Sequence, residues 1–389
     1  MTIRDYIRES FKRGFVQIVR RPMYALMMLI MPVVGALFLL SLMEQGAIRQ
    51  VPVGIVDLDQ SSMSRQLGRT LKSFPQVNVC LDYKDFSSAR AAVQRGEIMG
   101  FYLIPPELED RALGGRQPVV SYYVNYAYIA AASMQFKGFK TISLLANGGI
   151  AQVALRKVGL RPEAISATLQ PYVAHTYSPG NPWLNYNYYL CLSFVPCFFA
   201  LFVLLVTAFS LGTELKNGLS RQWLKVAGDN MVLALTGKLL PQTVVFTAVG
   251  WFIQWLMYCV YHLPLNCSPW HMLLAMPLFV MANQGFAVTM FCVTPNFRYG
   301  STLCSLLGML SFSFCGFSLP EEAMYPWVQS LGYTVPSKYY FLLSIDQALN
   351  GISLYYSRVY YAMLGLFILL PLLLTWRLKK ECKNPVYVP

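Results

Sequence analysis

Six long apolar runs without a single Asp, Glu, Lys or Arg constrain this chain more than any other feature of its sequence. They cover residues 23–43, 187–211, 239–261, 271–293, 299–319 and 359–376. A helix over the first run is about 31 Å long, enough to cross a hydrocarbon core of about 30 Å. Because a helix satisfies its own backbone hydrogen bonds in lipid, each run predicts a transmembrane helix. The predicted fold class is an α-helical polytopic membrane protein with six transmembrane helices.

The charge content also favours lipid over water as the solvent of much of this chain. Charged residues make up 13% of the 389 residues and hydrophobic residues 56%, whereas soluble domains carry about 25% charged residues. The net charge of +13 would fit a nucleic-acid partner, but the basic residues gather mainly at the ends of the apolar runs. Such flanks attract anionic headgroups, so we expect membrane lipids and no nucleic acid as partners.

The first run, within residues 22–43, has a competing interpretation as a secretory signal peptide, because basic residues precede it. A signal peptide has an apolar region of only about 7–15 residues and ends in a small-residue cleavage site. This run is longer and continues into Ser-Leu-Met-Glu-Gln-Gly. We therefore interpret it as an uncleaved transmembrane helix.

Short basic flanks predict the orientation of the runs, because Lys and Arg are enriched on the cytoplasmic side. The basic flanks contain Arg4, Arg8, Lys12, Arg13, Arg20 and Arg21; Lys216, Arg221, Lys225 and Lys238; Arg298; and Arg377, Lys379, Lys380 and Lys383. The intervening connection at 262–270 has no Lys or Arg, and the last connection opens with Glu321 and Glu322. Six spans then place both termini in the cytoplasm, including a basic tail at 377–389.

Residues 1–21 combine an apolar stripe with basic residues. The apolar positions at helical spacing are Ile3, Tyr6, Ile7, Phe11, Phe15, Ile18 and Val19. This pattern predicts an amphipathic helix in the inner interface that leads into the first span.

Residues 44–185 are long enough for an independent extracytoplasmic domain. Strand-like runs at 51–59, 77–83, 98–105 and 118–125 alternate with helical segments, of which Ser61 or Ser62 caps the first and Gly96 closes the second. A long helix is expected over 128–158. This order predicts an inserted α/β domain.

The sequence shows no convincing catalytic or metal-binding residues. Asp57 and Asp59 fit turn and cap geometry between a strand and a helix. His175 lies in a loop, and His262, Cys267 and His271 form only a weak metal-site pattern without a fourth ligand. Six of the nine cysteines lie within apolar runs, so no disulfide is expected, with a Cys80–Cys267 bridge left open.

Residues 212–238 form the most informative connection, between the second and third runs. Leu215, Leu219, Trp223 and Val226 follow helical spacing and predict one amphipathic helix. Such a helix either lies in the membrane interface or binds in a groove of a partner protein, and periodicity alone does not choose between them.

The whole chain resembles the membrane subunit of a type-2 ABC transporter, in the exporter subgroup with a large extracytoplasmic loop after the first span. The resemblance rests on segments that occur in the family's order: VGIVDLDQSSMSRQL, RGEIMGFYLIPPEL, GTELKNGLSRQWL, GKLLP and GFSLPEEAMYPWVQSLGYTVPSKYYFLLSIDQALNG. It implies a coupling segment at 212–238 that contacts the ATPase subunit. The coupling residues there would be Glu214, Lys216, Gly218, Leu219 and Trp223. It also implies a re-entrant segment at 320–351 that contains Pro320, Pro326 and Pro336.

The resemblance implies a permease that works as a pair, either with a second copy or with a paralogue. ATP and Mg²⁺ would be bound by a separate cytoplasmic ABC ATPase, because this sequence has no Gly-x-x-x-x-Gly-Lys-Ser/Thr loop. No cofactor is expected on this chain. A periplasmic adaptor and an outer-membrane channel are possible further partners of such an exporter.

The transmembrane runs contain few candidates for contact with a transported compound. An apolar or amphipathic substrate path would involve Phe194, Phe198, Phe199 and Phe202, and the polar pair Asn283 and Gln284. Packing roles compete with this interpretation, and polar pairs in membranes also hold helices together. Two other functions stay open: a membrane scaffold or sensor whose outer domain binds a ligand or partner, and a membrane enzyme that acts on lipid or cell-wall precursors.

Overall fold

The computed structural model describes residues 3–44, 50–73, 77–114, 116–127, 129–157, 185–317 and 319–383. The chain divides into two compact units, one of Met1–Gly46 with Tyr177–Pro389 and one of Ala47–Thr176. His175 lies outside the described residues.

The smaller unit is built on a four-stranded sheet with the order β2-β1-β3-β4. Its strands are β1 (Val51–Asp57), β2 (Val77–Tyr83), β3 (Gly100–Ile104) and β4 (Ser121–Val124), and its helices are α4 (Ser62–Lys72), α5 (Phe86–Arg95), α6 (Leu108–Leu113) and α7 (Ile129–Lys157). Strand β1 pairs in parallel with β2 and β3, while β4 is antiparallel to β3. The predicted α/β composition of this segment is therefore confirmed.

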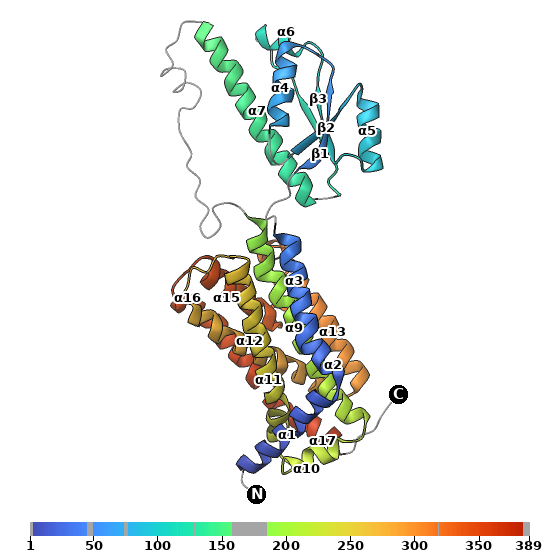
Figure 1. Cartoon of the computed structure of the whole chain (residues 1–389), viewed down its shortest axis with the longest axis vertical. Coiled ribbons are helices and arrows are strands. Elements are labelled where there is room, and N and C mark those ends of the chain that lie inside the picture. The colour runs from blue at the N-terminus through green and yellow to red at the C-terminus, as the bar shows by residue number, and fades with distance from the viewer. Residues whose placement is uncertain are drawn as a thin grey trace. The chain divides into compact units, whose positions relative to one another are not determined.

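Both faces of this sheet are covered. Val53 and Ile55 of β1 pack with Leu71 of α4 and Ile142 of α7 on one face. Val56 packs with Ala89 of α5 on the other face, and Figure 1 shows these helices on opposite sides of the sheet. A parallel strand buried on both faces explains why the sequence of β1 is almost continuously apolar.

Local signals set the helix ends in this unit. The Ser61 side chain caps α4 by accepting from the Ser64 N–H, at 3.1 Å. Gly96 ends α5 with a φ of +76°, a conformation that glycine adopts without strain. Helix α6 follows Pro105 and Pro106 and begins only at Leu108, because Glu107 before it takes a positive φ of 61°.

Asp57 and Asp59 both organise the loop between β1 and α4. Asp57 accepts from the backbone N–H of Asp59 and Gln60, each at 3.0 Å, and Asp59 accepts from the N–H of Leu108 at 2.9 Å. Burial raises the pKa of Asp59, but the Ser61 hydroxyl and the backbone N–H groups of Leu108 and Glu109 outweigh it and hold the pKa below its ordinary value. These contacts support the structural interpretation of the aspartate pair.

Acid is expected to loosen the junction between β1 and α6. Because the folded-state pKa of Asp59 is depressed, its contribution to stability is present above the unfolded pKa of about 3.9 and is lost as pH falls through the lower folded value. Amide exchange in the full chain, corrected for intrinsic rates, should show falling protection of α6 amides below this pH. Asp59→Asn should flatten the dependence, whereas Asp110→Asn, at an exposed position of α6, should leave it as in the wild type.

The larger unit is helical. Its elements are α1 (Ile3–Arg20), α2 (Pro22–Ala25), η1 (Leu26–Ile30), α3 (Met31–Met43), α9 (Tyr186–Lys216), α10 (Ser220–Val226), α11 (Met231–Trp255), η2 (Leu256–Val260), α12 (Pro269–Val293), α13 (Phe297–Phe314), η3 (Glu321–Ala323), α14 (Pro326–Tyr333), α15 (Pro336–Ser344), η4 (Ile345–Leu349), α16 (Leu354–Leu369), η5 (Leu370–Leu373) and α17 (Thr375–Lys383). Figure 1 shows α3, α9 and α13 running side by side.

Five helical stretches of the described residues are long and apolar enough to cross a membrane: Pro22–Leu42, Leu190–Lys216, Met231–Val260, Pro269–Val293 and Leu354–Lys383. The run at 299–319 forms α13, an 18-residue helix about 27 Å long. It begins with polar residues around Arg298 and ends at Phe314, before Gly316 takes a φ of +92°. The prediction of exactly six spans therefore stays a prediction.

Proline marks the breaks between α13 and α16. Pro320 precedes the short helix η3, and Pro326 and Pro336 occupy the first positions of α14 and α15, where a missing backbone N–H has no consequence. Lys338 of α15 is buried and pairs with Glu321 at 3.0 Å, which connects two of these short helices. The segment at 320–351 is thus a chain of short helices held together by a buried cation.

Candidate functional site

Helix α1 crosses α11 at very short range. A Cβ added at Gly237 would lie 2.3 Å from Cβ of Ser10, and one added at Gly14 would lie 3.1 Å from the Lys238 carbonyl oxygen. Ser10, Gly14 and Gln17 share one face of α1 at helical spacing, so the small and polar face is the one that meets α11. Small residues allow two helix backbones this close approach.

The predicted apolar stripe of α1 is split by this packing. Phe15 is 50% exposed and Val19 68% exposed, which leaves them free to face lipid, whereas Ile18 packs against the core of the unit. The contact through Ser10 and Gly14 was missed from the sequence, although small residues four apart are the signal that would have shown it.

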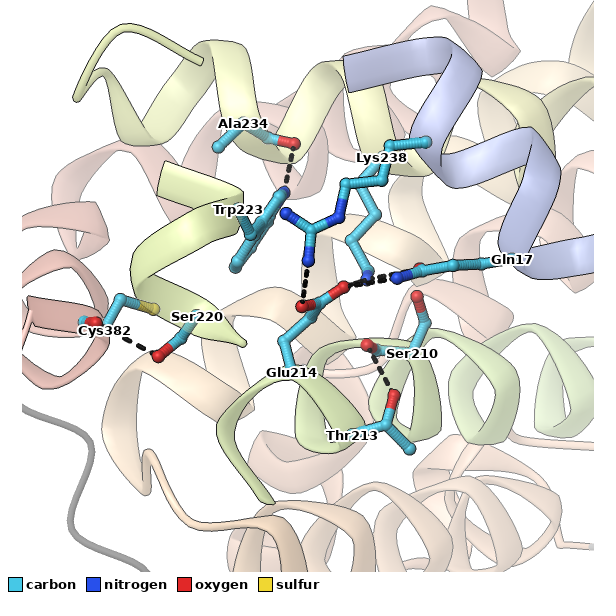
Figure 2. Close-up of polar contacts among 10 residues, drawn as sticks. Gln17, Ser210, Thr213, Glu214, Ser220, Trp223, Ala234, Lys238 and Cys382 are labelled. Atoms are coloured by element: carbon cyan, nitrogen blue, oxygen red, sulfur yellow. Dashed lines mark hydrogen bonds and ion pairs between the residues drawn. The ribbon is translucent and has the colours of Figure 1, made fainter. Parts of the chain in front are cut away.

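Glu214, near the end of α9, is the centre of a buried ion-pair cluster, drawn in Figure 2. Its side chain is 2% exposed. Oε2 accepts from Nη2 of Arg13 at 2.8 Å, and Oε1 accepts from Nε2 of Gln17 at 2.7 Å and from Nζ of Lys238 at 2.6 Å. We call Glu214, Lys238, Arg13 and Gln17 the charge centre. It joins α1, α9 and α11.

Lys238 is as deeply buried as the carboxylate that it neutralises. Its side chain is 3% exposed, and Nζ also donates to Oε1 of Gln17 at 2.9 Å. The ammonium lies 5.3 Å from the centre of the Trp223 ring, within the range of a cation–π contact. Both carboxylate oxygens of Glu214 and the ammonium of Lys238 therefore have hydrogen-bond partners, which a buried ion pair requires if it is to persist.

The charge centre continues into the membrane helices through uncharged polar contacts. Gln242, one turn after Lys238 on α11, donates to Oγ of Ser210 on α9 at 2.8 Å. Thr243 donates to Oε1 of Gln284 on α12 at 2.7 Å. Gln284 was predicted either to contact a substrate or to hold helices together, and its contact with Thr243 supports the second interpretation.

The prediction of an amphipathic helix through Leu215, Leu219, Trp223 and Val226 is wrong, because these residues do not lie on one helix. Helix α9 continues to Lys216, and Gly218 then takes a φ of +65° that ends the helical path. The seven-residue helix α10 follows, and α11 begins only at Met231. Leu215 and Trp223 therefore lie on different helices, and their shared periodicity was coincidental.

Helix α10 is held on two sides. The Trp223 indole donates to the Ala234 carbonyl of α11 at 3.2 Å, and the Ser220 hydroxyl donates to the Cys382 carbonyl of α17 at 3.0 Å. Figure 2 shows both contacts. Trp223 is 2% exposed, so it fastens α10 to its own chain.

The five predicted coupling residues therefore occupy two different environments. Glu214 and Trp223 are buried, Lys216 and Gly218 are exposed, and Leu219 is partly exposed. Gln222 and Lys225 are two further exposed residues of α10 that were not among the predicted coupling residues.

The residues predicted for a substrate path lie in separate packing contacts. The Phe194 ring is 5.0 Å from that of Phe317, and the Phe198 ring is 5.0 Å from that of Phe202. The Phe199 ring packs edge-on against Phe246. Asn283 donates to its own helix, at the Phe279 carbonyl. A cavity that Phe199 lines has none of the other predicted path residues in its lining.

The weak metal pattern is not assembled in the described part of the chain. His271 contacts Oε1 of Gln347 through Nδ1 at 3.2 Å, and Cys267 is a free thiol. The described residues contain no group of three His, Cys, Asp or Glu side chains that fits a metal ion. The side chain of Cys80 lies outside those described.

The fold and the charge centre define a polytopic helical membrane protein whose spans are connected by a short surface helix. The chain matches the ABC-2 family transporter proteins over residues 23–377 and belongs to that family. It is therefore a permease subunit of an ABC transporter, and the family implies an association with an ABC ATPase. A comparison with curated proteins found no match.

Proposed function

We propose that this chain exports a hydrophobic or amphipathic compound from the cytoplasm or inner leaflet, driven by ATP hydrolysis in a separate ABC ATPase. The observation that carries the proposal is the buried charge centre, which joins three helices beside the short surface helix α10. In this proposal the ATPase binds ATP and Mg²⁺ and contacts the turn and helix formed by residues 216–226.

Movement of α10 has direct routes into the membrane helices. It is continuous in sequence with α9 and α11, Trp223 fastens it to α11, and Ser220 fastens it to α17. The charge centre then prevents α9, α11 and α1 from separating. Because packed helices shift between discrete arrangements, a displacement at α10 favours a concerted change of the bundle.

The exposed side of α10 is the surface that we assign to the ATPase. Lys216, Gln222 and Lys225 are exposed there, and Gly218 exposes backbone in the turn between them. The surface is small, so the ATPase must contact further residues to reach the area of a stable interface.

Charge reversal on this surface is expected to disrupt the complex without unfolding the permease. Gln222→Glu with Lys225→Glu should lower the amount of co-purified ATPase about fivefold or more, because two negative side chains replace a neutral and a positive one in the proposed interface. The matched control is Gln66→Glu with Arg69→Glu, the same spacing on helix α4 of the smaller unit. Equal ATPase recovery from both double variants would refute the assignment of α10.

The same proposal includes the topology of the permease in the membrane. We propose six spans with α13 as the fifth, and both termini on the cytoplasmic side of a bacterial inner membrane. The 47–176 unit would lie outside, as in the large-loop subgroup.

The proposal also includes the assembly of the permease. It would function as a homodimer or heterodimer, and its outer unit would be available to an adaptor that leads to an outer-membrane channel.

Oδ1 of Asn283 and Nε2 of Gln284 are buried without a hydrogen-bond partner in the described residues. In this proposal the cargo reaches these polar atoms only after the helices around them move apart.

A further inference from the structure

A cavity of about 460 Å³ lies beside α1, close to the point where the chain enters its first apolar span. Four of the side chains that line it are cations, Lys12, Arg13, Arg20 and Arg21, and one, Glu9, is an anion. Val226 at the end of α10 also lines the cavity. The site is therefore strongly positive and borders the surface assigned to the ATPase.

The carboxylates nearby do not neutralise this charge. Glu9 pairs with Lys12 at 3.1 Å, and Glu214, which pairs with Arg13, is shared with Lys238. Among the described residues, neither Arg20 nor Arg21 has a carboxylate within ion-pairing distance. Two arginines and part of the charge on Arg13 thus remain available to an anion.

The surroundings of the cavity fit a lipid better than a soluble anion. Val16 lines the cavity and is 43% exposed, and Val19, one turn on, is 68% exposed. Pro22 begins the first apolar span directly after Arg21. An anion bound here therefore has apolar surface beside it, the combination that a phospholipid offers through its headgroup phosphate and acyl chains.

We propose that this cavity binds the headgroup of an anionic phospholipid, with Arg20 and Arg21 as the principal phosphate contacts. Arg13 lines the cavity and also pairs with Glu214, so a bound phosphate and the Glu214 carboxylate share one guanidinium. The lipid balances the excess positive charge beside the charge centre and holds α1 against α11. The assignment to the inner leaflet rests on the proposed orientation, whereas the binding itself does not.

The test is a lipid titration of the purified full-length chain, with phosphatidylglycerol compared with phosphatidylcholine of the same acyl chains and bound lipid counted by native mass spectrometry. Arg20→Gln with Arg21→Gln should weaken phosphatidylglycerol binding by about tenfold or more, because the charge-assisted hydrogen bonds from two guanidinium groups to one phosphate are lost. Arg20→Lys with Arg21→Lys should retain most of the preference, because the charge is kept.

The matched control removes two exposed cations from α17, by Arg377→Gln with Lys380→Gln. It should lower phosphatidylglycerol binding less than threefold. An equal loss in the control would show a diffuse surface effect and overturn the proposal, as would unchanged binding in the Arg20/Arg21 glutamine variant. Soluble glycerol 3-phosphate should compete poorly, and full competition by it would mean a free-phosphate site and overturn the lipid assignment.

These outcomes are independent of the proposed function. Lipid binding is measured without ATP or ATPase, so a failure of ATPase recovery would leave it unchanged. Thermal unfolding of each variant in phosphatidylcholine alone shows whether a loss of binding comes from a loss of fold.

Discussion

Glu214→Gln is expected to lower the free energy of unfolding of the permease by about 3–5 kcal/mol, because it leaves a buried cation without its counter-charge. Lys238 is 3% exposed and has no other carboxylate partner among the described residues, and Arg13 loses the same partner. The measurement is the unfolding midpoint of the purified chain in detergent, followed by tryptophan fluorescence.

The control for this variant is Glu9→Gln, which breaks the exposed pair with Lys12. Exposed pairs are worth about 0–1 kcal/mol, so the midpoint should barely move. The double variant Glu214→Gln with Lys238→Met removes both members of the central pair and should recover part of the loss, since neither charge is then left buried alone. Lys238→Met is measured alone as well. If the double variant lost as much unfolding free energy as the sum of the two single variants, the pair would not be energetically coupled.

Gly285→Ala is expected to separate α12 from α16 and to destabilise the permease by about 1–3 kcal/mol, the usual consequence of overpacking. A Cβ at this position would lie 2.2 Å from the backbone oxygen of Phe367. Backbone atoms of a packed helix do not move aside as a side-chain tip does, so the helices must shift. The measurement is again the unfolding midpoint in detergent.

Gly365→Ala, on α16 itself, is the matched control for this steric effect. A Cβ at Gly365 would meet no atom within 4 Å. Because alanine favours a helix by about 1 kcal/mol over glycine, this variant should be neutral or slightly stabilised. Equal destabilisation of both variants would mean that the loss of glycine itself, rather than contact with Phe367, causes the effect.

The elements of the smaller unit were predictable because nearby residues specify them. The Ser61 cap, the left-handed Gly96 and the apolar strand β1 each act over a few positions, so the predicted bounds lie close to the observed ones. The covering of both sheet faces also follows from the nearly continuous apolar character of β1. The apolar runs were equally clear, with the exception of α13, whose polar first turn and early end lower its hydropathy.

The candidate site was only partly predictable. The segment that carries it and the residues Glu214 and Trp223 were selected from the sequence, but as surface groups of one amphipathic helix. The Asn217–Gly218 pair is a local signal for a helix end that was missed, and Gly218 takes the positive φ that divides that helix. The role of α1 was missed as well, because its apolar stripe was more conspicuous than the small residues Ser10 and Gly14.

Hydropathy and local caps act along the chain, so they were enough to predict a helical membrane protein and the α/β elements of residues 51–157. The burial of Glu214 depends on packing between distant segments and could not be predicted, because its partners Arg13 and Lys238 lie 201 and 24 residues away. A carboxylate in a polar connection is exposed by default, and only packing between distant helices provides the counter-charges that allow its burial.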